Sequence, residues 1–377
     1  MIRYKPYLEF IRYSLNPKDE LLKNVAKIDW EGFFQFAEEQ GILGVVFVGI
    51  QRLGEHGVKP PFEVLMQWIA SSTQIERQNK AVNKAAFALF EELKDDGFGG
   101  CILKGQGNNL LYPNIYSRTP GDIDVWLLPK SDGRGLMADG RCLKEDVRGI
   151  IKYVKERNPK GKVCYHHIDY GTYKGVEVEV HYRPSFMFNP VHNSRLQRWF
   201  RKMADGGCLM AELPENTGSI RIPTREFNII FQLSHIYNHL LHEGIGLRQI
   251  IDYYYVLKSN TNRTNNTNSI DLLHYLGLTK IAGAMMWVLH EILGLEEEYL
   301  IAPKDEKRGK VLLNEILRGG NFGHYDTANR QATTPFKKNI QRLKRDFRMV
   351  CYFPSECFWE PAFRVYHYFW RQWQKYA

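Results

Sequence analysis

Long apolar runs and paired cysteines are both missing from this sequence of 377 residues. No run approaches the roughly 18 uncharged apolar residues that a membrane-spanning helix needs, so we expect no membrane partner. The six cysteines include no CxxC pair, which excludes a zinc ribbon and a dense disulfide framework. The opening segment carries frequent charges and lacks the apolar core of a signal peptide, so we expect a cytoplasmic protein.

Several catalytic motifs are absent as well. The sequence has no GxxxxGK[ST] loop and no HRD or DFG triplet, which argues against phosphoryl transfer of the P-loop or protein-kinase type. It also lacks HExxH. His235, His239 and His242 fall near one face of a predicted helix, and we expect them to be hydrogen-bonded helix histidines rather than zinc ligands.

The composition is that of a folded, basic protein. Hydrophobic residues make up 44% and charged residues 25% of the chain, which excludes global disorder. Lys and Arg number 51 against 42 Asp and Glu, a formal charge of +9 that suits an anionic partner. Nucleotide phosphate and nucleic acid are both partners of this kind.

The hydrophobic pattern divides the sequence into three regions. Residues 1–95 show helical spacing, including one long helix predicted over 61–97, and residues 221–377 show it again. Between them, residues 96–220 contain short β-type runs bounded by glycine, proline and asparagine, so a small α/β core is expected there. The runs are CILKG (101–105), DIDVWLLP (122–129), VCYHHIDY (163–170) and GVEVEVHYRP (175–184).

The most informative segment, residues 118–127, contains two aspartates separated by one residue. Alternate side chains of a strand share a face, so Asp122 and Asp124 project together while the apolar residues between and after them face the core. A cation between the carboxylates relieves their repulsion, and Mg²⁺ accepts carboxylate and phosphate oxygens, so the pair predicts a metal site. Gly121 allows a close backbone approach, and Arg118 lies in the turn where a guanidinium reaches phosphate.

A second acidic strand lies downstream. In GVEVEVHYRP, Glu177, Glu179 and His181 alternate with valines and therefore share one face. A solvated face on a half-buried strand has the same pattern. Alternation also does not say which of the two glutamates would hold a metal.

Four motifs occur in order along the chain: Leu103-Lys104-Gly105, Tyr112-Pro113, Arg118 to Asp124, and Glu179-Val180-His181-Tyr182-Arg183. Together they resemble the nucleotidyltransferase superfamily with a polymerase-beta-like core, and most closely its bacterial group of uncharacterised nucleotidyltransferases. A further likeness, from His239 to Asp252, extends the resemblance over roughly residues 85–260.

The resemblance implies an α+β fold, with a small mixed-sheet core at 96–220 between an N-terminal helical region (1–95) and a C-terminal helical domain (221–377). It implies Mg²⁺-dependent transfer of an NMP group from an NTP, such as ATP, to a small-molecule or peptide-type acceptor, with pyrophosphate leaving. Asp122 and Asp124 would then hold Mg²⁺ on the triphosphate. Glu179, which matches the family's Glu-h-His pattern, would complete a site for two ions.

Other positions have two interpretations each. His181 would orient the acceptor or a metal-bound water, or be structural. Arg248 and Asp252, four residues apart on a predicted helix, would form an intrahelical ion pair or line the nucleotide or acceptor pocket.

The turn at residues 104–107 reads Lys-Gly-Gln-Gly, where relatives usually carry Gly-Ser or Gly-Gly. Lys104 would contact phosphate or be a solvent-facing strand end, and backbone N–H groups near Gly105 and Gly107 are the other means of holding phosphate. Because the turn departs from the family pattern, a catalytically degenerate nucleic-acid-binding module of the same fold is the alternative function.

Overall fold

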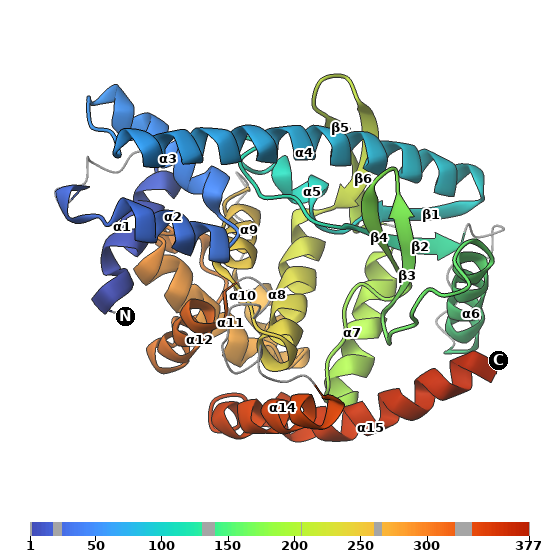
Figure 1. Cartoon of the computed structure of the whole chain (residues 1–377). Coiled ribbons are helices and arrows are strands. Elements are labelled where there is room, and N and C mark those ends of the chain that lie inside the picture. The colour runs from blue at the N-terminus through green and yellow to red at the C-terminus, as the bar shows by residue number, and fades with distance from the viewer. Residues whose placement is uncertain are drawn as a thin grey trace. The chain divides into compact units, whose positions relative to one another are not determined.

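The structure is a computed structural model that describes residues 2–17, 25–129, 140–204, 206–259, 266–320 and 334–376 (Figure 1). The helices are α1 (Lys5–Leu15), α2 (Trp30–Glu39), α3 (Leu43–Glu55), α4 (Phe62–Asp95), α5 (Gln106–Asn109), α6 (Gly140–Arg157), α7 (Pro190–Met203), α8 (Arg225–His242), α9 (Leu247–Lys258), α10 (Asn266–Tyr275), α11 (Thr279–Trp287), α12 (Glu306–Gly319), α14 (Pro335–Met349) and α15 (Pro354–Tyr376). The strands are β1 (Phe98–Ile102), β2 (Ile123–Pro129), β3 (His167–Tyr173), β4 (Val176–His181), β5 (Cys208–Leu213) and β6 (Gly218–Pro223). Short turns of other helix types are η1 (Ile2–Tyr4), η2 (Val25–Lys27), η3 (Val288–Ile292) and η4 (Glu297–Tyr299).

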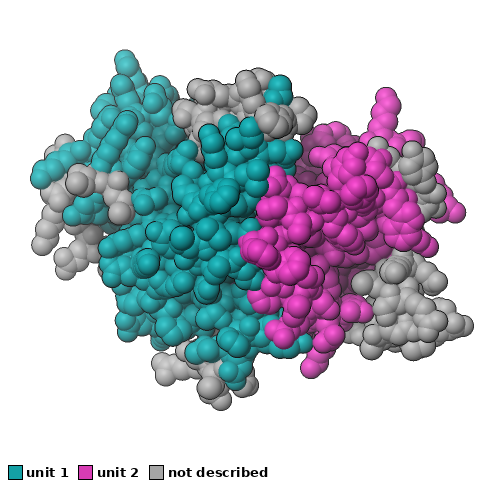
Figure 2. Space-filling model, turned by 90° about the horizontal axis from the view of Figure 1, so that it is seen from below, with its two compact units in different colours: residues 1–78, 111–119, 235–357 teal, residues 79–110, 120–234, 358–377 magenta. Residues whose placement is uncertain are grey.

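The chain forms two compact units, coloured separately in Figure 2. Unit 1 comprises residues 1–78, 111–119 and 235–357, and unit 2 comprises residues 79–110, 120–234 and 358–377. Each unit is therefore assembled from separate stretches of the sequence. The domain boundaries expected at residues 95 and 220 stay a prediction.

Unit 2 contains a four-stranded sheet in the order β1-β2-β4-β3. β1 pairs antiparallel with β2, β2 pairs parallel with β4, and β4 pairs antiparallel with β3. The sheet is therefore mixed. Together with the surrounding helices, it confirms the α+β class expected from the sequence.

Alternating valine and isoleucine residues decide which face of the two central strands, β2 and β4, is turned toward the core. Ile123 and Val125 of β2, and Val178 and Val180 of β4, are each at most 2% exposed. These side chains fix one face of the sheet toward the core, so the residues between them lie on the other face. Helix α6 packs against β2 and β3, and β6 of the β5–β6 hairpin lies beside β1 (Figure 1).

Unit 1 is a helical assembly. Helix α1 packs on α3, and α11 packs on α12. Aromatic rings fill part of its core: Phe33 lies 5.4 Å from Phe10 and 6.0 Å from Trp68 between ring centroids. Helix α9 is buried from Leu247 to Leu257, so the polar residues that it carries lie inside the unit.

Most of the expected elements are present. The long helix expected at 61–97 is α4, and it is followed by Gly97, whose φ of +89° suits glycine. The apolar stretch at 30–53 divides into α2 and α3 at Gly41, which has a φ of +68°. The β5–β6 hairpin was not among the expected strands. Within the described ranges, no helix is both long and apolar enough to cross a membrane.

Candidate functional site: carboxylates and histidines on the sheet of unit 2

A row of three carboxylates crosses the polar face of the sheet. The parallel register of β2 and β4 sets Asp124 opposite Glu179, and the antiparallel register of β4 and β3 sets Glu179 opposite Asp169. Partner positions on neighbouring strands place side chains on the same face, so the three carboxylates are neighbours. Asp124 is only 2% exposed, whereas Glu179 and Asp169 are half-buried.

Two histidines form the next row on this face. His181 follows Glu179 by two residues on β4 and lies opposite His167 on β3. Its Nε2 is 2.9 Å from Asp124 Oδ1 and 3.5 Å from Glu179 Oε2. His167 Nδ1 is 3.5 Å from the same Glu179 oxygen. The imidazoles therefore lie directly against the carboxylate row.

Lys104 supplies a positive charge to the row, with its Nζ 3.0 Å from Asp124 Oδ1. Burial acts to raise the pKa of Asp124, but the Lys104 ammonium and the hydrogen bond to His181 outweigh it and hold that pKa below its usual range. Burial acts to lower the pKa of Lys104, but the nearby carboxylates of Asp124, Asp122 and Glu179 outweigh burial and raise that pKa above its usual value. Both groups are therefore charged at neutral pH.

The pKa values of the two histidines are shifted in opposite directions. Burial acts to lower the pKa of His181, but its hydrogen bonds to Asp124 and Glu179 raise that pKa to about 9. At His167 burial is the largest effect; it outweighs the attraction of the Glu179 carboxylate and lowers the pKa to about 4. Burial acts to raise the pKa of Glu179, but the hydrogen bond to His181 and the charges of His167 and His181 together outweigh it and lower that pKa.

Asp122 and Glu177 differ from the buried row. Asp122 lies immediately before β2 and is exposed, as is the adjacent Gly121. Glu177 is also exposed and accepts a hydrogen bond from Thr172 Oγ1. The register thus sets Glu179, rather than Glu177, opposite Asp124.

The turn after β1 holds Lys104 next to the row. The backbone N–H of Leu103 donates to the Asp124 carbonyl at 2.9 Å, which ties the end of β1 to β2. Gly105 follows with a φ of +58°, a backbone conformation that favours glycine. The turn leads into α5, a helix of four residues.

A network of buried amides fixes α5. Asn108 Oδ1 accepts a hydrogen bond from Gln232 Nε2 at 2.9 Å, and Asn109 Nδ2 donates to Asn79 Oδ1 at 2.6 Å. Amides buried together in this way rigidify the elements that carry them. The buried members are Asn79, Asn83, Gln106, Asn108, Asn109, Asn228 and Gln232.

Four polar residues form a separate buried cluster inside unit 1. Arg118 forms two hydrogen bonds to Asp252, Nε to Oδ1 at 2.7 Å and Nη2 to Oδ2 at 2.8 Å. The Tyr112 hydroxyl donates to Asp252 Oδ1 at 2.6 Å, and Arg248 Nη1 donates to the Thr119 carbonyl at 3.3 Å. Arg118 and Tyr112 thus both hold the Asp252 carboxylate. The phosphate role of Arg118 and the pocket role of Arg248 and Asp252 stay predictions.

Three residues of the site were not singled out from the sequence: His166, His167 and Asp169. They belong to VCYHHIDY, a run that was expected to be a strand. His167 and Asp169 flank the buried Ile168, and this alternation is the signal that would have placed both on the polar face.

Comparison with known proteins identifies the family. Residues 26–294 match the model of a family described as uncharacterised nucleotidyltransferase, and the chain belongs to that family. A crystal structure of an antigenic nucleotidyltransferase-like protein from Paracoccidioides brasiliensis is 14% identical, covering 60% of this chain and 96% of that chain, with a TM-score of 0.36. No curated protein matches the chain.

Proposed function

We propose that the protein is a Mg²⁺-dependent nucleotidyltransferase that moves an NMP group from an NTP to a small-molecule or peptide-type acceptor. Membership of the nucleotidyltransferase family supports the reaction class. The observation that carries the proposal is the register of β2 and β4, which brings Asp124 and Glu179 side by side on a polar face. The family's acidic motifs lie on two strands, and the register brings one carboxylate of each motif together.

The donor atoms suit a hard divalent cation. Asp122, Asp124 and Glu179 would hold it, because carboxylate and phosphate oxygens are the ligands that Mg²⁺ prefers. When bound, Mg²⁺ would neutralise charge on the triphosphate as pyrophosphate leaves. Asp122 is exposed and would meet the nucleotide from solvent, and the buried Asp124 is held by its contact with His181.

Lys104 is proposed to hold phosphate. Its ammonium is near Asp124 and Asp122, yet its side chain remains 19% exposed, so it is accessible to a ligand. The raised pKa keeps it cationic, and a cation attracts the triphosphate oxygens. The buried amides below α5 would maintain the position of the turn.

Glu179 is proposed as the third carboxylate because it lies opposite Asp124, whereas Glu177 is occupied by Thr172. His181 is proposed to orient Asp124, since its Nε2 lies 2.9 Å from that carboxylate. Neither role requires a rearrangement of the strands.

The first test is nucleotide binding measured by thermal shift with ATP, GTP, CTP and UTP, each with and without Mg²⁺. At one hundred times its Kd, a ligand of the native state adds about 2.7 kcal/mol to the free energy of unfolding. One nucleotide should raise the Tm only with Mg²⁺, and Asp122→Asn should abolish the shift. Asp122 is exposed, so the variant should keep the Tm of the ligand-free protein.

The same variant tests the alternative function. Salt-dependent RNA binding that survives Asp122→Asn, without any nucleotide shift in the wild type, would support a degenerate nucleic-acid-binding module instead. Loss of the nucleotide shift in the variant would support the enzyme.

A further inference from the structure

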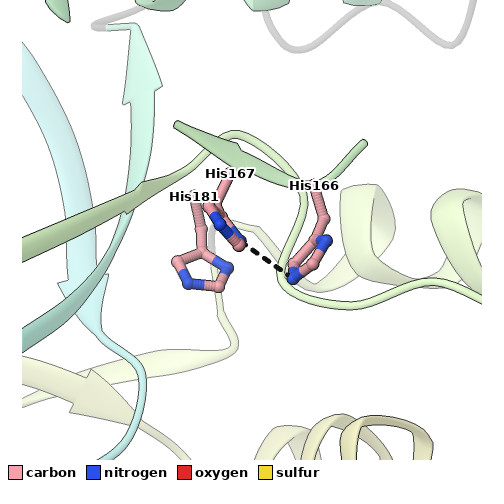
Figure 3. A group of neighbouring side chains, drawn as sticks. All are labelled: His166, His167 and His181. Atoms are coloured by element: carbon pink, nitrogen blue, oxygen red, sulfur yellow. Dashed lines mark hydrogen bonds between the residues drawn. The ribbon is translucent and has the colours of Figure 1, made fainter. Parts of the chain in front are cut away.

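Three histidine rings meet beside the carboxylate row (Figure 3). One nitrogen from each of His166, His167 and His181 lies within 4.8 Å of the other two. His167 and His181 are cross-strand partners on β3 and β4, and His166 immediately precedes β3. His167 Nδ1 is 3.0 Å from His166 Nε2. The pairing of the strands therefore builds the cluster.

His181 has one ring nitrogen that the protein leaves without a hydrogen bond. Its Nε2 contacts Asp124, whereas its Nδ1 is buried and has no hydrogen-bond partner. In Figure 3 one ring nitrogen of His181 is turned toward the side where His167 and His166 lie. With a proton, Nδ1 lacks an acceptor; without one, it lacks a donor. Either state leaves a buried polar atom unsatisfied, which is unfavourable, and a cation at Nδ1 removes that cost.

We propose that His166, His167 and His181 form a binding site for a transition-metal cation of the zinc class. Imidazole nitrogens suit zinc, cobalt, nickel and copper, whereas magnesium and calcium prefer oxygen. Zinc–nitrogen bonds of 2.0–2.1 Å place tetrahedral ligands about 3.4 Å apart. The 3.0 Å separation of the His166 and His167 nitrogens is close to that spacing.

The contact between His181 and Asp124 strengthens the assignment. Metal-binding histidines usually direct their second ring nitrogen to a carboxylate, which fixes the tautomer and the ring orientation. His181 does this through Nε2, at 2.9 Å from Asp124 Oδ1. Asp124 is thus a positioning residue for this site, and the cation would in turn hold His181 against Asp124.

The histidine site does not depend on nucleotidyl transfer. Its donors are nitrogen atoms, whereas the proposed Mg²⁺ site uses the oxygens of Asp122, Asp124 and Glu179. The two sites share the contact between His181 and Asp124, but His166 and His167 belong to the histidine site alone, so variants of these two residues test it separately. A direct measurement of metal binding separates them, because it needs neither a nucleotide nor an acceptor.

The experiment titrates the full chain, without a histidine tag and freed of metal by a chelator, with Zn²⁺ against a zinc indicator and with Co²⁺ by visible absorption. We expect one Zn²⁺ per chain, a Co²⁺ ligand-field spectrum of a low-coordinate nitrogen site, and no displacement by excess Mg²⁺. His166→Gln and His167→Gln should each weaken Zn²⁺ binding by about 100-fold or more. The control is His56→Gln, because His56 is exposed at the end of α3 and lies outside the cluster.

Each result of the titration either supports the histidine site or overturns it. Loss of the Zn²⁺ equivalent and of the Co²⁺ spectrum in the cluster variants, with both retained in His56→Gln, would establish the site. Retention of wild-type Zn²⁺ affinity in a folded His166→Gln/His167→Gln double variant would overturn the proposal. Absence of stoichiometric Zn²⁺ binding in the wild type would overturn it equally. Circular dichroism confirms that each variant is folded.

Discussion

Replacing Asp252 with asparagine should leave the Arg118 guanidinium buried without its countercharge. Each side chain of the pair is 7% exposed, and two charge-assisted hydrogen bonds of 2.7 and 2.8 Å join them. An amide retains the shape of the carboxylate but not its charge, and Tyr112 loses a charged acceptor. Removing one partner of a buried ion pair costs about 3–5 kcal/mol, and that is the loss expected in the free energy of unfolding.

Urea unfolding, followed by far-UV circular dichroism and tryptophan fluorescence, measures this loss. The midpoint should fall while the m-value stays unchanged, because m follows the surface exposed on unfolding. Glu306→Gln is the matched control: Glu306 pairs with Lys310 in the same unit, at 2.6 Å, but these side chains are 66% and 49% exposed. An exposed pair of this kind should contribute no more than about 0.5 kcal/mol.

Arg118→Lys separates charge from geometry. Lysine keeps the charge but loses the two parallel hydrogen bonds, so its cost should lie between those of the other two variants. The expectation is contradicted if Asp252→Asn lowers the free energy of unfolding by less than about 1 kcal/mol, or by no more than Glu306→Gln does.

Three further predictions concern the turn, the amide network and acid stability. Lys104→Gln should weaken Mg²⁺–NTP binding at least about tenfold in calorimetry, since a hydrogen bond to a charged group is worth about 1.5–3 kcal/mol; unchanged affinity would contradict the phosphate role. Asn108→Leu should cost about 1–3 kcal/mol, because it removes the acceptor of Gln232; a Tm equal to that of the wild type would argue against the network. The pKa of Asp252 is lowered from 3.8, since Arg118 and Tyr112 outweigh burial, so its contribution to stability is present above pH 3.8 and is lost as the pH falls below it. Wild type should therefore lose more unfolding free energy between pH 5 and 2.5 than Asp252→Asn, and parallel curves would refute this.

Local alternation was enough to predict the polar face that carries Asp124 and Glu179, because the period of a strand fixes which side chains share a face. It did not choose between Glu177 and Glu179. That choice depends on how β4 aligns with β2, and this register is set by core packing between strands far apart in the sequence.

Other contacts could not be predicted from local sequence patterns. Arg118 and Asp252 are 134 residues apart, so their pairing depends on the tertiary fold of unit 1. Arg248 and Asp252 have the spacing of an intrahelical pair, whereas nothing in the local pattern indicated that Asp252 also binds Arg118. The histidine cluster likewise depends on the antiparallel pairing of β3 with β4. The alternation of polar and apolar residues in β3 could have placed His167 on the polar face, but it could not show that His167 lies near His181.

Asp124 and Glu179 are proposed to support nucleotidyl transfer. The most direct test of this proposal is pyrophosphate release from the NTP identified by thermal shift, with Mg²⁺ and a pool of hydroxyl- and amine-bearing small molecules and peptides as acceptors. Glu179→Gln and Glu177→Gln form a matched pair, two residues apart on the same face of β4. We predict that Glu179→Gln abolishes release and that Glu177→Gln leaves it near the wild-type rate. Equal activity in the two variants, or no release by the wild type with any NTP, would contradict the claim.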